Sequence, residues 1–96
     1  MFTNEEQARY AVELSEALER LEQNADFKRV IKDAYLDESA KGIILTLAYA
    51  TENQVRERIN KLIGISNFQL FLAGVKANGI RAHEALNDPS VFEQGE

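Results

Sequence analysis

The 96-residue sequence has no cysteine, no tryptophan and a single proline. Without cysteine the chain forms no disulfide bond and offers no thiolate nucleophile or cysteine ligand for zinc. One proline and five glycines are too few turn residues for a β-sandwich. No apolar run approaches the ~20 residues of a membrane span, and no basic-then-apolar leader opens the sequence. We therefore expect no membrane insertion and no secretion through a signal peptide.

The composition is that of one small globular domain. Hydrophobic residues make up 45% of the chain and charged residues 28%, which is enough apolar material for one modest core. The net charge is −5. Because a general nucleic-acid binder gains its affinity by neutralising phosphates, this acidic balance predicts no direct contact with nucleic acid.

The first 25 residues have the periodicity of an amphipathic helix. Thr3 and Glu6 have capping-box spacing, so the helix is predicted to begin near Thr3 or Asn4. It is predicted to end at Gln23 or Asn24, because asparagine tolerates a C-cap conformation. Its apolar seam alternates at spacings of four and three residues, which is a heptad pattern. The seam comprises Gln7, Ala11, Leu14, Leu18, Leu21 and Ala25.

Two shorter helices are predicted in the middle of the chain. Asp26 is the expected N-cap of the first, and Asp37 is the expected N-cap of the second. The second includes residues 40–50, which are nearly all apolar and which we expect to form a buried helix, because no partner strand exists elsewhere. The apolar face of the first comprises Phe27, Val30, Ile31, Ala34 and Tyr35.

A long last helix is predicted from about Glu52 to Leu86. Thr51 and Gln54 have capping-box spacing at its start. Gly64 and Gly79 are candidate weak points, although Gly79 lies on the seam, where a close helix approach would also require glycine. Residues 87–96 are expected to be a mobile acidic tail. From Ile65 onward the seam comprises Phe68, Leu72, Val75, Gly79, Ala82 and Leu86.

These patterns together predict an all-α fold of three to four helices. Residues 1–86 are expected to form a single helical domain in which the long C-terminal helix packs on the N-terminal helix, as a hairpin or a bundle. The first helix is acidic and the last is basic, which suits their pairing. The charges alone leave open whether that pairing occurs within one chain or between chains.

The sequence offers little for catalysis. His83 is the only histidine, which excludes a two-histidine metal site and leaves a surface position as the simplest role. The serines lack a nucleophile-elbow context, and the glycines form no phosphate-binding loop. Neighbouring acidic residues such as Glu5 and Glu6 stand at helix starts, where capping explains them. We expect no catalytic, metal or cofactor residues, no small-molecule substrate, and therefore no enzyme.

The apolar seams exceed what a helical unit of this size can bury. We therefore expect part of this surface to be covered by another copy or by a different protein. The alternative is an isolated chain whose long helix bends at Gly64 or Gly79 and folds back. The candidate interaction residues are Leu14, Leu18, Leu21, Phe68, Phe71, Leu72 and Val75.

Two stretches of the chain resemble a group of small proteins of tailed bacteriophages. Residues 24–31, which read NADFKRVI, and the following Tyr35 are similar to the group's N-P-D-F-K-x-(V/L)-I…Y stretch, with Ala25 in place of the proline. The segment Leu62-Ile63-Gly64-Ile65, with Phe71-Leu72, Gly79 and Ala82, is similar to its later I-G…(F/Y)-L…G-x-x-A pattern. These relatives are short, acidic, all-helical proteins from head-and-tail gene regions.

The resemblance implies a non-enzymatic virion or assembly protein in the virion or the host cytoplasm. Such a protein would be a head, connector or tail accessory or a scaffold-like helper. Its expected partners are copies of itself and a phage capsid, portal or tail protein. The alternative is a small acidic phage regulator that binds and inhibits a host protein, an idea motivated by the acidic first helix.

Overall fold

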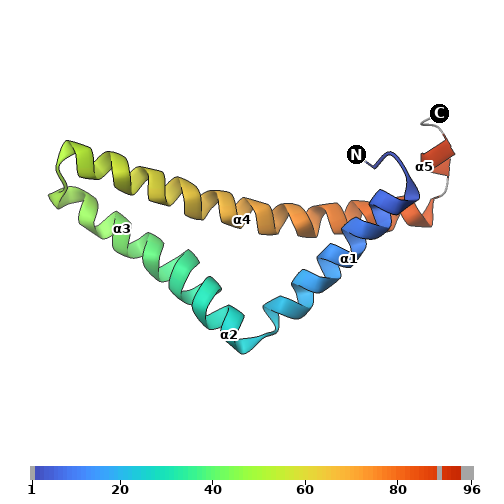
Figure 1. The fold of residues 1–96 in the computed structure, drawn as a ribbon, viewed down its shortest axis with the longest axis horizontal. Helices are drawn as coiled ribbons and strands as arrows, with labels where there is room; N and C mark the ends of the chain where they lie inside the picture. The colour runs from blue at the N-terminus through green and yellow to red at the C-terminus, as the bar shows by residue number, and fades with distance from the viewer. Residues whose placement is uncertain (1, 89, 94–96) are drawn as a thin grey trace. The chain divides into compact units, whose positions relative to one another are not determined.

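The computed structural model describes residues 2–88 and 90–93 of the chain. Almost all of this described part is helical, and it contains no strand, so the all-α prediction is confirmed. The elements are shown in Figure 1. In chain order they are α1 (Glu5–Glu22), α2 (Ala25–Phe27), η1 (Lys28–Ser39), α3 (Ala40–Thr46), η2 (Leu47–Tyr49), α4 (Glu52–Asn87) and α5 (Ser90–Glu93).

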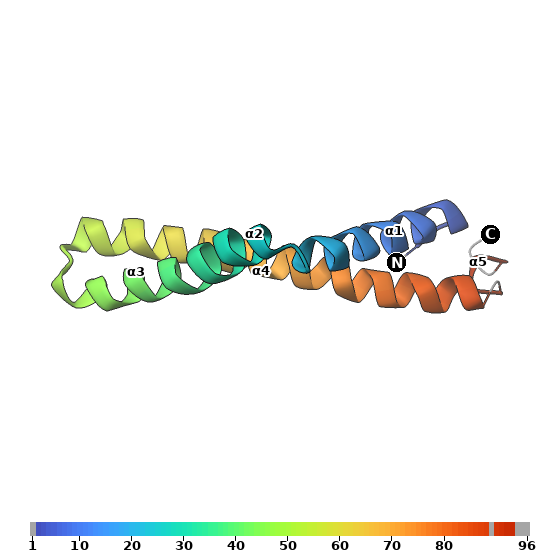
Figure 2. The ribbon, with the colours of Figure 1, turned by 90° about the horizontal axis from the view of Figure 1, so that it is seen from below.

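The segments α2, η1 and α3 form one continuous helix, which we call the composite helix (residues 25–46). Lys28 and Ser39, at its two internal junctions, have right-handed helical dihedral angles, and Figure 2 shows one uninterrupted coil. The prediction that Asp37 begins a new helix is therefore wrong. Asp37 instead lies inside the composite helix and forms an i,i+4 ion pair with Lys41, with 3.1 Å between Oδ1 and Nζ.

The chain divides into two compact units. The terminal unit comprises residues 1–21 and 72–96, and the central unit comprises residues 22–71. The helix α4 contributes its C-terminal part to the first and its N-terminal part to the second, and it is continuous through Gly64 and Gly79. The predicted tail falls partly on Pro89 and residues 94–96, which lie outside the described residues. The single domain at 1–86 stays a prediction.

In the terminal unit α1 packs on the C-terminal part of α4, as predicted. The contact is closest at Gly79, where a Cβ atom would overlap the Cβ and Oγ of Ser15 and lie 3.7 Å from the carbonyl oxygen of Ala11. Small side chains therefore let the two backbones approach. The buried side chains of this unit are Ala8, Leu18, Leu72, Val75, Ala82 and Ala85.

The register of α1 differs from the predicted one. The inward positions are Ala8, Ala11, Ser15, Leu18 and Glu22, whereas the predicted seam included Leu14 and Leu21, which are exposed. Both sets have heptad spacing, so periodicity alone does not choose between them. The small residues determine which register packs on α4, because Ser15 fits against Gly79 and a leucine at that position would not.

In the central unit the composite helix lies alongside the N-terminal part of α4. Leu36 and Ile65 are buried, and the ring of Tyr35 meets the ring of Phe68 edge-on, with centroids 5.9 Å apart and an interplanar angle of 89°. Arg58 Nη1 donates to the carbonyl oxygen of Thr46 at 2.9 Å, which fastens the end of the composite helix to α4.

The segment η1 is a π-helix, in which hydrogen bonds run from residue i to i+5 and each turn holds more residues than in an α-helix. Within this segment Leu36 is buried, and Ile31 and Lys32, which precede it by five and four residues, are half-buried. Val30 and Ala34 of the predicted apolar face are exposed.

The run at residues 40–50 is helical as predicted, but the prediction that it is buried is wrong. Ile44, Leu45 and Tyr49 are exposed. Its least exposed positions, Ala40, Ile43, Leu47 and Ala50, are only half-buried, and its other apolar side chains are left in solvent. The chain therefore has more apolar helix surface than its own elements cover.

The helix N-termini are capped by side chains as predicted, but at two of them the capping residue differs from the predicted one. Thr51 and Gln54 form the predicted reciprocal capping box, with bonds of 3.0 and 3.3 Å. At α1, however, Gln7 and not Glu6 reaches back, accepting from the backbone N–H of Thr3 at 2.9 Å. The composite helix is capped by Asn24 and not by the predicted Asp26.

Candidate interaction surface

The described residues contain no cluster of three histidine or acidic side chains that could hold a metal ion. His83 lies in a groove of about 470 Å³ in the terminal unit, with Glu16 and Glu84 on its walls. The floor of this groove is the close approach of Gly79 and Ser15, and Val12 and Ile80 supply apolar walls. The groove offers one imidazole, two carboxylates and the hydroxyl of Ser15 in an otherwise apolar lining.

Within the described part of the chain, none of the helices combines the length and the apolar character needed to cross a bilayer. The apolar side chains that lie outside the core are instead spread over amphipathic helices that also carry many charges. The candidate surface for contact with a partner is therefore formed by exposed helix faces.

The structure divides the seven predicted interaction residues between core and surface. Leu18, Leu72 and Val75 are buried in the terminal unit, and Phe68 is half-buried against Tyr35 in the central unit. Leu14, Leu21 and Phe71 are exposed. The three exposed residues are thus available to a partner, while the contacts of the buried ones are already made within the chain.

The first exposed apolar stripe, which we call the α1 face, consists of Tyr10, Leu14, Ala17 and Leu21. These positions are spaced by four, three and four residues, so they follow one side of the helix. Their large side chains are between 40% and 57% exposed. The α1 face exists because the small residues of α1 occupy the contact with α4 and leave the larger ones outside.

The second stripe, the α4 face, consists of Ile59, Ile63, Ser66 and Leu70 in the central unit. It has the same spacing of four, three and four residues, and its large side chains are between 45% and 67% exposed. The sequence pattern includes Ile59 and Ile63 among apolar positions without separating them from the buried seam. The spacing shared with the α1 face is the signal that could have identified them.

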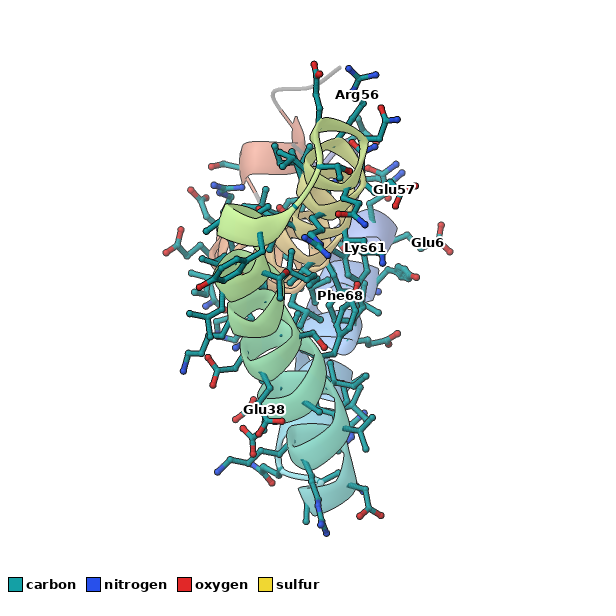
Figure 3. The ribbon with its side chains drawn as sticks, turned by 90° about the vertical axis from the view of Figure 1, so that its left-hand side faces the viewer. Glu6, Glu38, Arg56, Glu57, Lys61 and Phe68 are labelled. Carbon is teal, nitrogen blue, oxygen red and sulfur yellow. The ribbon has the colours of Figure 1, made fainter. Side chains whose placement is uncertain are left out.

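The charges around the two faces have opposite signs. The helix α1 carries six glutamates and two arginines, a net charge of −4, whereas the part of α4 in the central unit carries three basic and two acidic residues, a net charge of +1. Arg56, one turn before Ile59, is exposed and projects outward in Figure 3. The ion pair of Arg9 with Glu5 lies on the exposed surface of α1 and leaves the other exposed glutamates of that helix in excess.

No protein-family profile, curated protein or solved structure matches this chain. The assignment of a function therefore rests on the two faces, on their charges and on the resemblance of the motifs.

Proposed function

We propose that this chain is a non-enzymatic bacteriophage virion or assembly protein that works through apolar helix faces. Its roles would be those of a head, connector or tail accessory or a scaffold-like helper. One observation carries the proposal: large apolar side chains stay exposed along two helix faces, the α1 face in the terminal unit and the α4 face in the central unit.

The exposed surface is rich in large apolar side chains. Among the described residues the buried core contains eight hydrophobic residues, of which three are alanines. Contiguous exposed apolar patches mark sites of association, whereas isolated apolar residues do not. The exposed large hydrophobic residues are Tyr10, Leu14, Leu21, Val30, Tyr35, Ile44, Leu45, Tyr49, Ile59, Ile63, Leu70, Phe71 and Ile80.

The assignment to a bacteriophage is supported by the motifs at residues 24–35 and 62–82. Proteins of that group are short, acidic and helical, and a virion accessory acts by docking on copies of itself or on a capsid, portal or tail protein. On this proposal residues 1–86 act as one helical domain, and partner helices complete its helix pairs into a bundle. The protein resides in the virion or in the host cytoplasm during assembly.

The acidic surface of α1 favours one alternative. Glu5, Glu6, Glu13, Glu16 and Glu19 are all exposed, so α1 could present carboxylates to a basic site of a host enzyme. A regulator of this kind is made early in infection and is absent from particles, whereas a structural protein co-purifies with them.

Mass spectrometry of purified virions and procapsids tests the proposal. We expect the chain in at least one of these particles at a fixed copy number relative to the capsid protein. Its absence from both particles, together with early synthesis and co-purification with a host protein, would support the regulator and overturn the structural role.

A further inference from the structure

We propose that the α1 face binds a basic amphipathic helix of a different protein, with lysine or arginine side chains of that helix opposite Glu6 and Glu13. The inference rests on the proposed function, because it names the chemistry of one partner through which that function would act. All the residues that carry it belong to α1 within the terminal unit.

One edge of the α1 face is free and charged. Glu6 lies four residues before Tyr10 and Glu13 lies three residues after it, so both carboxylates border the apolar stripe. Arg20 follows at the same edge after a further seven residues. All three residues are exposed, and Glu6 projects away from α1 in Figure 3. We call Glu6, Glu13 and Arg20 the α1 edge.

The opposite edge of the face is closed by the chain itself. Ala11 and Leu18 occupy the equivalent positions on the other side of the stripe, where Leu18 is buried and Ala11 is half-buried. The carbonyl oxygen of Ala11 lies beside Gly79 in the contact with α4. A partner helix therefore meets charge along the α1 edge only. In paired helices the charged residues beside an apolar seam set the choice and the orientation of the partner.

The two carboxylates of the α1 edge have no partner within the described part of the chain. Arg9 is paired with Glu5, and among the described residues neither Glu6 nor Glu13 forms an ion pair or a side-chain hydrogen bond. Their uncompensated charge repels the phosphates of nucleic acid and attracts cationic side chains. The complementary occupant therefore carries basic residues beside its own apolar seam, and an acidic residue opposite Arg20 completes the match.

The spacing of the α1 face favours a helix as the occupant. Tyr10, Leu14, Ala17 and Leu21 alternate at four, three and four residues, which keeps an apolar seam facing one partner helix. At 1.5 Å per residue the stripe is ~17 Å long, so about three turns of a second helix cover it. Anchors at such spacings are those by which amphipathic helices are recognised.

The α4 face of a second copy does not complement the α1 edge. The positions beside its seam are uncharged, so a copy that docked through this face would leave Glu6 and Glu13 unmatched. Those positions are Asn60, Leu62, Asn67 and Gln69.

A second α1 face also complements the edge less well than a basic helix does. Antiparallel pairing brings Glu6 of one copy to Arg20 of the other, but it sets the two Glu13 carboxylates against each other at the centre. Parallel pairing places the two glutamates opposite Ala11 and Leu18, which carry no charge. A different sequence is needed to supply cations at both glutamates.

Two synthetic peptides test the proposal on the full chain. Each contains about three heptads with a leucine seam, and the positions beside the seam are all lysine in the basic peptide and all glutamate in the acidic peptide. These like charges keep each peptide from pairing with itself. In fluorescence anisotropy we expect the chain to bind the basic peptide on the order of 10-fold more tightly than the acidic one. Equal affinities, or no binding of the basic peptide, would overturn the inference.

Charge reversal on α1 locates the preference. The double variant Glu6→Lys with Glu13→Lys should bind the acidic peptide more tightly than the basic one. The matched control, Glu16→Lys with Glu19→Lys, changes the net charge by the same amount on other sides of α1 and should keep the preference for the basic peptide. All four positions are exposed, so the helical circular dichroism should be retained. Reversal by both double variants would show that net charge selects the peptide, which contradicts a role for the α1 edge.

Substitution within the stripe tests its apolar part. Leu14→Asn should weaken binding of the basic peptide on the order of 10-fold, because it buries an amide in the interface. Leu45→Asn, at a position that is 75% exposed in the central unit, is the control and should leave the affinity unchanged. We expect light scattering to show the same oligomeric state for Leu14→Asn and the natural chain. A natural dimer that this substitution dissociates would identify a second copy as the occupant and reject the proposal.

The failures of the two proposals are distinguishable. Loss of the peptide preference overturns this inference, while mass spectrometry of particles still decides the structural role. A chain that prefers the basic peptide through the α1 edge but is absent from virions and procapsids supports the inference and overturns the structural role.

Discussion

Gly79 and Ser15 lie so close together that any Cβ atom at position 79 would overlap the side chain of Ser15. This one contact fixes which side of α1 meets α4. With Ser15 in the contact, Ala8, Ala11 and Leu18 also turn inward, and Leu14 and Leu21 turn out. The exposed α1 face is therefore a consequence of the close approach.

Gly79→Ala should destabilise the chain even though alanine favours a helix. The substitution gains ~1 kcal/mol in helix propensity, but forcing a methyl group against Ser15 costs ~1–3 kcal/mol in overpacking. We expect a net loss of up to about 2 kcal/mol in the free energy of unfolding, measured by urea denaturation at a fixed protein concentration.

Gly64→Ala is the matched control, because nothing lies within 4 Å of a Cβ at that position. It should stabilise the chain by ~0.5–1 kcal/mol. The double variant Ser15→Gly with Gly79→Ala should recover part of the loss, since the methyl group then has space. Equal stabilisation by Gly64→Ala and Gly79→Ala would show that α1 does not approach α4 closely at this residue.

The sequence predicts the helices well because their signals are local. The capping box of Thr51 and Gln54 and the seam from Phe68 to Leu86 need no knowledge of the rest of the chain. The face that α1 buries was not predictable in the same way. Two heptad registers are available on α1, and the choice depends on Gly79, which lies far away in the sequence.

Asn24→Ala should cost ~1 kcal/mol of stability, because Asn24 is the observed cap of the composite helix. Its Oδ1 accepts from the backbone N–H groups of Asp26 at 2.9 Å and Phe27 at 3.0 Å. Thermal unfolding followed by circular dichroism measures the effect. Asp26→Ala, at the predicted cap, is the comparison and should cost less, since Asp26 contributes only its charge near the helix N-terminus. A larger loss for Asp26→Ala would restore the predicted cap.

The composite helix shows a second limit of prediction from sequence. Spacings of three and four residues place Val30 and Ala34 on the apolar face, but that inference assumes α-helical winding. In the π-helix the faces are redistributed, and Leu36 becomes the buried residue while Val30 is exposed. Nothing in the local pattern of Lys28–Ser39 signals this winding. The unpartnered α4 face was missed for a related reason, since Ile59 and Ile63 lie beside the buried seam.

The edge-on contact of Tyr35 and Phe68 should be measurable as a coupling energy. A double-mutant cycle with Tyr35→Leu and Phe68→Leu is expected to give ~0.5–1.5 kcal/mol beyond the two single effects, because edge-to-face aromatic pairs contribute this much in addition to their burial. Urea denaturation of the four proteins provides the values. As a control, a cycle that pairs Phe68→Leu with Tyr49→Leu should show additivity, since Tyr49 is 90% exposed. A coupling near zero for the first cycle would contradict the ring contact.

Phe71 and Leu72 are neighbours in the sequence, but their substitution by alanine is expected to change the free energy of unfolding by different amounts. Leu72 is 9% exposed and Phe71 is 60% exposed. Leu72→Ala should lower the free energy of unfolding by about 2 kcal/mol or more, because it opens a cavity in the terminal unit. Phe71→Ala should change the stability of the chain by no more than about 0.5 kcal/mol, as expected for a surface site.

These two variants, compared by urea denaturation at one protein concentration, separate core from surface within the predicted interaction set. The concentration is held fixed because association would otherwise shift the apparent stability. A large loss for Phe71→Ala with little change for Leu72→Ala would reverse the assignment of the two side chains. In that case the buried side of α4 would pass through Phe71, and the seam from Phe68 to Leu86 would not be the one that packs in the folded chain.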